Sequence, residues 1–241
     1  MARMDGRADD ELRPVRFITG FVAYPEGSVL IETGGTRVLC NVSVEGKLPA
    51  WREASGGGWL TAEYAMLPRA THTRTPRSAA AEGARAQEIR RLIGRSLRAA
   101  VDLERLGPHT LILDCDVLQA DGGTRTAAIT GGYLALALAL RRMVEAGQVP
   151  ADLRTTPVAA VSTGLVDGRP LLDLCYAEDV AAQADLNVVM SSDGRFVEVQ
   201  VTAERDPFDR AALDRLLDLA ATGVQQLLRR QLEALAEVDV S

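Results

Sequence analysis

The chain has 241 residues, 47% of them hydrophobic, and a formal net charge of −6 at pH 7, with a sequence pI of about 5.1. These values suit one compact α/β domain, or two tightly joined halves, with a substantial core. Three widely spaced cysteines argue against a disulfide framework and indicate a reducing compartment. The N-terminus lacks the apolar core of a secretory signal, and the longest apolar run, 133–140, is too short to span a bilayer. The sequence therefore predicts a soluble cytoplasmic protein.

Strand patterns fill the first third of the chain. They predict strands at residues 16–22, 28–33, 36–44 and 59–64, with a hairpin turn at Gly34-Gly35. Residues 70–82 are rich in Thr, Pro, Ser and Ala and predict an exposed loop. A helix is expected over residues 85–103, because apolar side chains recur there every three or four positions.

The segment from Arg69 to Arg98 reverses the bulk charge. It holds eight arginines against Glu82 and Glu88, a local charge of +6, which leaves −12 on the rest of the chain. A basic patch on an acidic protein is typical of a surface that binds a polyanion. The alternative is a solvated helix face whose arginines pair with acids elsewhere in the fold.

A strand, a glycine turn and a helix follow one another around Asp121-Gly-Gly-Thr-Arg-Thr126. Residues 110–119 alternate as a strand does, and residues 127–143 are rich in Ala and Leu, as a buried helix is. A helix N-terminus has unpaired N–H groups and a positive dipole, so Arg125 is out of place there unless an anion binds. The turn therefore predicts an anion site. The alternative is an N-cap threonine, with Arg125 pointing into water.

The second half repeats the pattern of the first. Strands are expected at residues 156–165, 169–174, 186–190 and 196–202, with turns at Asp167-Gly168 and Asp193-Gly194. A final helix is expected with Asp206 as N-cap and Pro207 as its first residue, running to about Leu235. Two strand-rich blocks, each closed by a helix, predict an α/β (α+β) fold of two similar halves packed on helices.

Asp179 and Asp185 lie at the edges of apolar segments in the second half. If regular structure is interrupted near residues 181–184, one carboxylate would come from a loop and the other from the start of the next strand. Two such carboxylates could bind Mg²⁺, or one could donate a proton to a leaving oxygen. The alternative is a pair of turn and cap carboxylates. His72 and His109 fit no catalytic or metal-binding arrangement and are expected to be ordinary surface or turn residues.

Several stretches in order resemble the bacterial ribonuclease PH family, phosphorolytic 3′-to-5′ exoribonucleases that trim tRNA 3′ ends. The resemblance covers nearly the whole chain, so residues 1–241 are expected to form a single ribonuclease PH-like domain. The matching stretches are Asp5–Arg7, Leu12–Pro14, Gly58–Tyr64, Met66–Arg74, Gln87–Arg98, Asp114–Thr126 and Asp185–Val188.

The resemblance implies a role for each candidate residue. The phosphate-binding motif would be Gly123, Thr124 and Arg125, with Arg85 as a second phosphate-binding arginine; Asp179 and Asp185 would be the acidic pair linked to metal binding and general-acid chemistry; Arg69, Arg74 and Arg77 would form the basic loop that contacts tRNA. The family assembles into a hexameric ring, a trimer of dimers. In one departure, Ala84-Arg85-Ala86 stands where the family usually has Gly-Arg-Thr.

The implied activity is phosphorolytic removal of 3′-terminal nucleotides from tRNA precursors. Inorganic phosphate would be the co-substrate, nucleoside diphosphates the products, and Mg²⁺ the expected metal. Two anions would then lie close together, and the arginines and the helix N-terminus would offset their repulsion. The alternative is a catalytically inactive, RNA-binding ring subunit of an exosome-like assembly. That alternative predicts the loss of the phosphate arginine or the acidic pair, and both are present.

Overall fold

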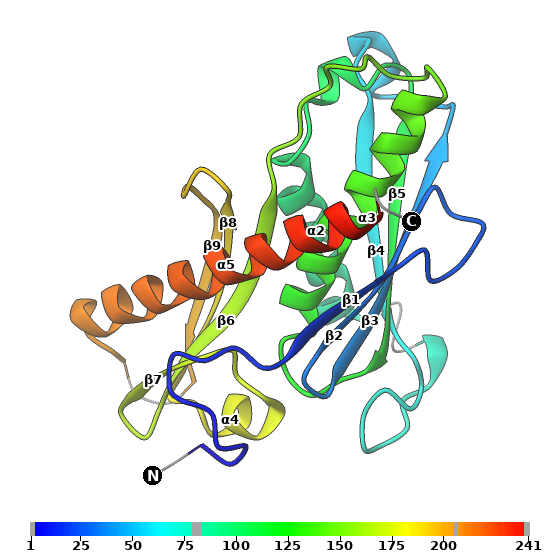
Figure 1. Cartoon of the computed structure of the whole chain (residues 1–241). Helices are drawn as coiled ribbons and strands as arrows, with labels where there is room; N and C mark the ends of the chain where they lie inside the picture. Colours follow the sequence, from blue (N-terminus) through cyan, green and yellow to red (C-terminus); the bar gives the residue numbers. More distant parts are fainter. Residues whose placement is uncertain (1–2, 79–82, 205–206, 239–241) are drawn as a thin grey trace.

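The computed structural model describes residues 3–78, 83–204 and 207–238 and contains two β-sheets (Figure 1). The first sheet has the order β1-β2-β3-β5-β4, in which only β4 is parallel to its neighbour among the described strands. Its strands are β1 (Val15–Thr19), β2 (Gly27–Thr33), β3 (Thr36–Glu45), β4 (Trp59–Met66) and β5 (Thr110–Gln119). The second sheet, β7-β6-β8-β9, is antiparallel. Its strands are β6 (Val158–Val166), β7 (Arg169–Leu172), β8 (Ala184–Ser191) and β9 (Phe196–Ala203).

Helices lie between and against the sheets. They are α2 (Ala84–Arg98), α3 (Thr124–Glu145), α4 (Tyr176–Ala181) and α5 (Arg210–Val238), with 3-10 turns at Glu53–Ser55 and Leu103–Arg105. Helix α3 packs against β2 and β3 on one side and β6 on the other, and α2 packs against β4 and α3. The long α5 crosses the second sheet in Figure 1 and covers the face of β6, β7 and β8. The layers are thus sheet, helix pair, sheet and helix.

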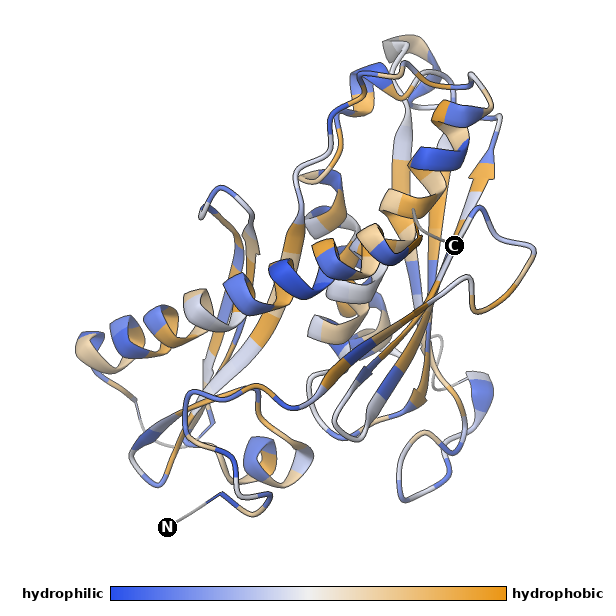
Figure 2. Ribbon diagram, viewed as in Figure 1, coloured by the Kyte–Doolittle hydropathy of each residue, from blue (hydrophilic) through white to orange (hydrophobic). Residues whose placement is uncertain are grey.

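Alternation of side chains along β5 shows why the core forms where it does. Leu111, Leu113, Cys115 and Val117 are at most 1% exposed and face the helix layer. Helix α3 has the length and composition of a membrane-crossing helix, but 78% of its apolar window is buried inside the protein. In Figure 2 its ribbon is mostly orange and pale, with blue near its C-terminal end, and it lies against the strands, as expected for the central helix of a packed core.

The predicted fold class, the two strand-rich halves and all three glycine hairpin turns are confirmed. The helix predicted over 85–103 is shorter, because α2 ends at Arg98 and Val101 then forms a β-bridge with Thr155. The expected start of the last helix is wrong. Pro207 lies before α5, whose backbone at Ala212 donates to the Asp209 carboxylate at 2.7 Å; Asp206 lies outside the described residues.

The loop expected over residues 70–82 is confirmed over residues 70–76, whereas residues 77–78 are helical. Ala70 is buried, whereas residues 71–78 are exposed or half-buried; residues 79–82 lie outside the described residues. Cys40 and Cys115 are register partners in β3 and β5, and all three cysteines are free thiols. The short helix α4 was not predicted; Asp179 was expected to lie in a loop or at a strand end.

Candidate active site

A cleft of about 820 Å³ brings together residues from both halves of the protein. The first half contributes the glycine turn before α3 and the start of α2. The second half contributes α4 and the facing ends of β6, β8 and β9. All six residues predicted for phosphate and acid chemistry line this cleft: Arg85, Gly123, Thr124, Arg125, Asp179 and Asp185. Arg69, Arg74 and Arg77 are exposed on the neighbouring segment.

The turn before α3 requires its two glycines. Gly122 and Gly123 have φ of +76° and +66°, the left-handed region that side chains disfavour. A Cβ on Gly122 would also lie 2.6 Å from the carbonyl oxygen of Leu174. Thr36 stabilises the turn through two hydrogen bonds: its hydroxyl donates to the Gly122 carbonyl at 2.6 Å and accepts from the Asp121 N–H at 2.9 Å.

The geometry of the turn leaves the start of α3 open to an anion. Gly123 is the N-cap, so the alternative of an N-cap threonine is wrong; Thr124 is the first helical residue. Its hydroxyl lies 2.8 Å from the Tyr64 hydroxyl, and burial raises the pKa of that tyrosine. Within the described chain, the first turn of α3 contains no acidic residue and no side-chain cap. The positive end of the helix dipole therefore faces the cleft without a protein anion at the cap.

Arg125 does not point freely into water. Its side chain is 17% exposed, and Nη1 donates to the Gln200 amide oxygen at 3.0 Å and to the Glu88 carboxylate at 3.2 Å. Gln200 in β9 and Glu88 in α2 thus fix the guanidinium at the cleft wall. Sequence patterns identified Arg125 but neither partner, because their spacing in the chain, 75 and 37 residues away, leaves no local signal.

Arg85 stands in the first turn of α2, exposed at the cleft. Of the two alanines that depart from the family pattern, Ala86 is 5% exposed and belongs to the core, whereas Ala84 is exposed. The departure at position 86 therefore lies on the packing side of the helix, away from the cleft.

The acidic pair reaches the cleft from two elements. Asp179 lies on α4, and Asp185 is the second residue of β8. Burial raises the pKa of Asp179, opposed by the charges of Arg85 and Arg125. Burial, then the charges of Asp179 and Glu204, raise the pKa of Asp185. A carboxyl group with a raised pKa keeps its proton closer to neutral pH, as a general acid must.

The same carboxylates have donor chemistry that suits Mg²⁺. Among the described residues there is no group of three or more His, Cys, Asp or Glu side chains placed to hold a metal ion. Mg²⁺ is commonly bound through one or two carboxylates together with waters and substrate phosphates, so a site of this kind needs no larger group of protein ligands. Asp179 and Asp185 therefore fit this ion.

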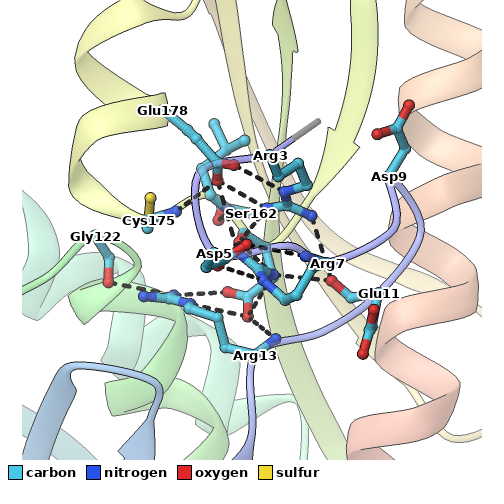
Figure 3. Close-up of polar contacts among 12 residues, drawn as sticks. Arg3, Asp5, Arg7, Asp9, Glu11, Arg13, Gly122, Ser162, Cys175 and Glu178 are labelled. Carbon is cyan, nitrogen blue, oxygen red and sulfur yellow. Dashed lines mark hydrogen bonds and ion pairs between the residues drawn. The ribbon is translucent and has the colours of Figure 1, made fainter. Parts of the chain in front are cut away.

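An arginine network, which the sequence did not predict, fixes α4 (Figure 3). The Arg3 guanidinium binds both oxygens of Glu178 at 2.8 and 2.7 Å, and Glu178 also accepts from the Cys175 N–H at the start of α4. The Arg13 guanidinium binds both oxygens of Asp173 in the same two-point manner. The N-terminal segment thereby holds the helix that carries Asp179.

Part of the basic segment is paired within the fold. Arg90 bonds Glu63 at 2.9 Å and Arg95 bonds Glu198 at 2.6 Å. Arg98 stacks on the Trp59 ring at 4.7 Å. Pairing with acids elsewhere therefore accounts for part of the arginine excess on α2, while the arginines of 69–78 stay exposed.

Comparison with known proteins decides the family. The model of the 3′ exoribonuclease family, domain 1, matches residues 11–141, and that of domain 2 matches residues 156–223. The chain belongs to the 3′ exoribonuclease family. It is 57% identical over 235 residues to the Ribonuclease PH of Corynebacterium efficiens, covering 97% of this chain and 96% of that protein. It is 57% identical over 238 residues to the Ribonuclease PH of Nocardia farcinica, covering 97% and 92%.

Solved structures share the fold of this exoribonuclease at lower identity. The Archaeoglobus fulgidus exosome with RNA bound to the active site matches with a TM-score of 0.81 and 24% identity, over 95% of this chain and 92% of that one. Rice Rrp46 matches with a TM-score of 0.77 and 17% identity, over 95% and 98%. The Ribonuclease PH relatives identify the enzyme as a phosphorolytic 3′-to-5′ exoribonuclease and do not favour an inactive ring subunit.

Proposed function

We propose that this exoribonuclease shortens the 3′ ends of tRNA precursors in the cleft between its two halves. Gly123, Thr124 and Arg125 bind the attacking inorganic phosphate, with Arg85 as the second cation. The observation that carries this assignment is the meeting of two helix N-termini, each with an arginine in its first turn, in one cleft that also contains three carboxyl groups, those of Asp179, Asp185 and Glu204. Such a cleft is suited to an anion that must approach a phosphodiester.

In the proposed reaction, a phosphate oxygen attacks the last phosphorus of the RNA. The bond from that phosphorus to the preceding 3′-oxygen breaks, and the terminal nucleotide leaves as a nucleoside diphosphate. Arg85 and Arg125 offset the repulsion between the two anions and the charge of the transition state. Asp185 protonates the departing 3′-oxygen, a role that its raised pKa supports.

Mg²⁺ offers a second route for stabilising the same oxygen. Asp179 and Asp185 would hold the ion, which supplies positive charge beside the leaving oxygen. An Asp185 that binds Mg²⁺ is ionised, and one that donates a proton is not. The pH dependence of turnover therefore separates the two roles.

The exposed arginines 69, 74 and 77 are proposed to contact the tRNA backbone. A structural relative, the Archaeoglobus fulgidus exosome, has RNA bound to its active site, which supports RNA in the corresponding cleft here. We also propose that this chain assembles into a hexameric ring, a trimer of dimers, in the cytoplasm; its similarity to subunits of exosome assemblies supports the oligomer. Light scattering on the purified protein tests the hexamer: a monomer or a dimer at all concentrations would contradict it.

One experiment tests the core of this function. A tRNA precursor and an unstructured RNA with the same 3′ tail are incubated with and without inorganic phosphate, and the released nucleotides are identified. We expect nucleoside diphosphates that appear only with phosphate, and faster trimming of the tRNA precursor. Equal rates on the two RNAs would contradict the tRNA preference, and monophosphates released without phosphate would contradict phosphorolysis.

A further inference from the structure

The buried guanidinium of Arg13 touches both walls of the cleft from behind. The residue is 4% exposed. Its Nη1 donates to the Asp121 carbonyl at 2.6 Å, and Nη2 reaches the Gly122 carbonyl at 3.5 Å. The Nε and Nη2 atoms bond the two carboxylate oxygens of Asp173 at 3.0 and 2.7 Å. Figure 3 shows this side chain extending from the N-terminal segment toward Gly122.

These contacts determine which way the glycine turn presents its backbone. The carbonyl groups of Asp121 and Gly122 point at Arg13 and Thr36. In a trans peptide the N–H points opposite to the C=O, so the N–H groups of Gly122 and Gly123 point away from Arg13. Both glycines line the cleft. Arg13 thus holds the carbonyl side of a turn whose amide side is free for an anion.

The other partner of Arg13 leads to the acidic wall. Asp173 is 2% exposed, has a left-handed φ of +53°, and lies two residues before the N-cap of α4. Its carboxylate also accepts from the Arg13 backbone N–H at 2.9 Å. Helix α4 carries Asp179, and the charge of Arg13 opposes the rise that burial causes in the pKa of Asp179. Arg13 and the turn belong to family domain 1, whereas Asp173 belongs to domain 2.

We propose that Arg13 is a positioning residue that sets the separation between the phosphate-binding turn and the acidic helix. The proposal rests on the proposed function, which assigns phosphate to the turn. A planar guanidinium with five donors is needed, because one group must bond a carboxylate in two places and backbone carbonyls in two more. A lysine at position 13 would keep the charge and lose this geometry.

Arg3 provides a matched control for Arg13. It is 5% exposed, and it also bonds a buried carboxylate in two places, that of Glu178. Among the described residues, its other hydrogen bonds go to the N-terminal segment and to the Asp173 carbonyl, and not to the glycine turn. Arg3→Lys and Arg13→Lys therefore disrupt similar two-point contacts with a buried carboxylate, and only Arg13→Lys loosens the turn.

The test measures KM for phosphate, KM for RNA and kcat for the full-length enzyme, with urea denaturation as the measure of folding. For Arg13→Lys we expect kcat/KM for phosphate to fall roughly 10- to 100-fold, since a displacement of about 1 Å can cost on the order of 100-fold. The KM for RNA should stay near the wild-type value. Arg3→Lys should lose comparable stability and keep the wild-type KM for phosphate. A wild-type phosphate KM in Arg13→Lys, or an equal rise in Arg3→Lys, overturns the proposal.

Two further variants keep the test decisive. If Arg13→Lys does not fold, Asp173→Asn takes its place under the same criteria, because it keeps the side-chain shape and weakens the grip on Arg13. Arg125→Ala is measured in parallel. An unchanged phosphate KM in Arg125→Ala overturns the phosphate site and this inference with it. If Arg125→Ala raises the phosphate KM but the variant at position 13 or 173 does not, only this inference is overturned.

Discussion

Arg85 and Arg125 hold equivalent positions in two different helices. Each is the second residue of its helix, α2 and α3 respectively, each helix has a glycine as N-cap, and both side chains line one cleft. Basic residues are disfavoured at a helix N-terminus, because they repel its positive dipole. These two placements bring two arginines and two helix N-termini to the part of the cleft where phosphate is proposed to bind.

Replacing either arginine should weaken the use of phosphate. Arg125→Ala removes a charge-assisted contact of about 1.5–3 kcal/mol, which corresponds to roughly a 10- to 100-fold rise in the phosphate KM. Arg85→Ala should act in the same direction. The control is Arg95→Ala, because Arg95 also lies on α2 but pairs with Glu198. Steady-state rates against phosphate concentration measure the effect; a rise in the control equal to that in Arg125→Ala would contradict the assignment.

Local patterns in the sequence were sufficient to predict one wall of the cleft. The strand of 110–119, the two glycines and Arg125 follow one another within sixteen residues. The local pattern therefore contains both the turn and the unusual arginine at the helix N-terminus. The sheets and hairpins were predicted for the same reason, since alternation and glycine turns are local properties.

Contacts between distant segments could not be predicted in this way. Arg13 and Asp173 are 160 residues apart, and a single arginine beside a proline has no signature of burial. Helix α4 was missed because it has only six residues and its N-cap is Cys175, which forms a capping box with Glu178 in place of the usual serine or threonine. The position of Asp179 on a helix follows from that cap and from Arg3, which no short sequence window contains.

Asp185→Asn should abolish turnover while RNA binding persists. The amide keeps the size of the side chain but cannot protonate the departing oxygen, and general-acid catalysis contributes about 100- to 10,000-fold. Single-turnover rates and filter binding of the same RNA measure the two properties. Asp193→Asn, on the turn between β8 and β9, is the control. Wild-type turnover in Asp185→Asn would show that the catalytic assignment is wrong.

Glu204→Gln should shift the pH profile of kcat. The charge of Glu204 contributes to the raised pKa of both Asp185 and Asp179, so its removal lowers both values. If Asp185 acts as a protonated acid, the alkaline limb of kcat then moves to lower pH. Glu198→Gln, on β9, which ends one residue before Glu204, should leave the limb in place because Glu198 pairs with Arg95. An unshifted limb in Glu204→Gln, together with a measured requirement for Mg²⁺, would favour the metal-binding role for Asp185.

Replacing the exposed arginines 69, 74 and 77 should weaken RNA binding without impairing cleavage. The three side chains are exposed beside the cleft, whereas the residues proposed to bind phosphate line it. They are expected to contact the RNA backbone, so their combined replacement by alanine should weaken binding of long, structured RNA. The salt dependence of binding should flatten by about 0.7–0.9 in slope for each RNA phosphate that the variant no longer neutralises. Short oligonucleotides, which need only the cleft, should be degraded at near-normal rates.

The control for this triple variant removes the same charge elsewhere. Arg215, Arg229 and Arg230 are exposed on α5, and their replacement by alanine changes the net charge equally. It should leave the salt slope for structured RNA unchanged, because electrostatic attraction between exposed groups is screened beyond about 10 Å at 0.1 M salt. Light scattering establishes that both triple variants assemble as the wild type does. If the variant at 69, 74 and 77 then loses activity on short oligonucleotides as severely as on tRNA, these arginines belong to the catalytic cleft itself. If the loss is confined to structured RNA, the three arginines bind the part of the RNA that lies outside the cleft.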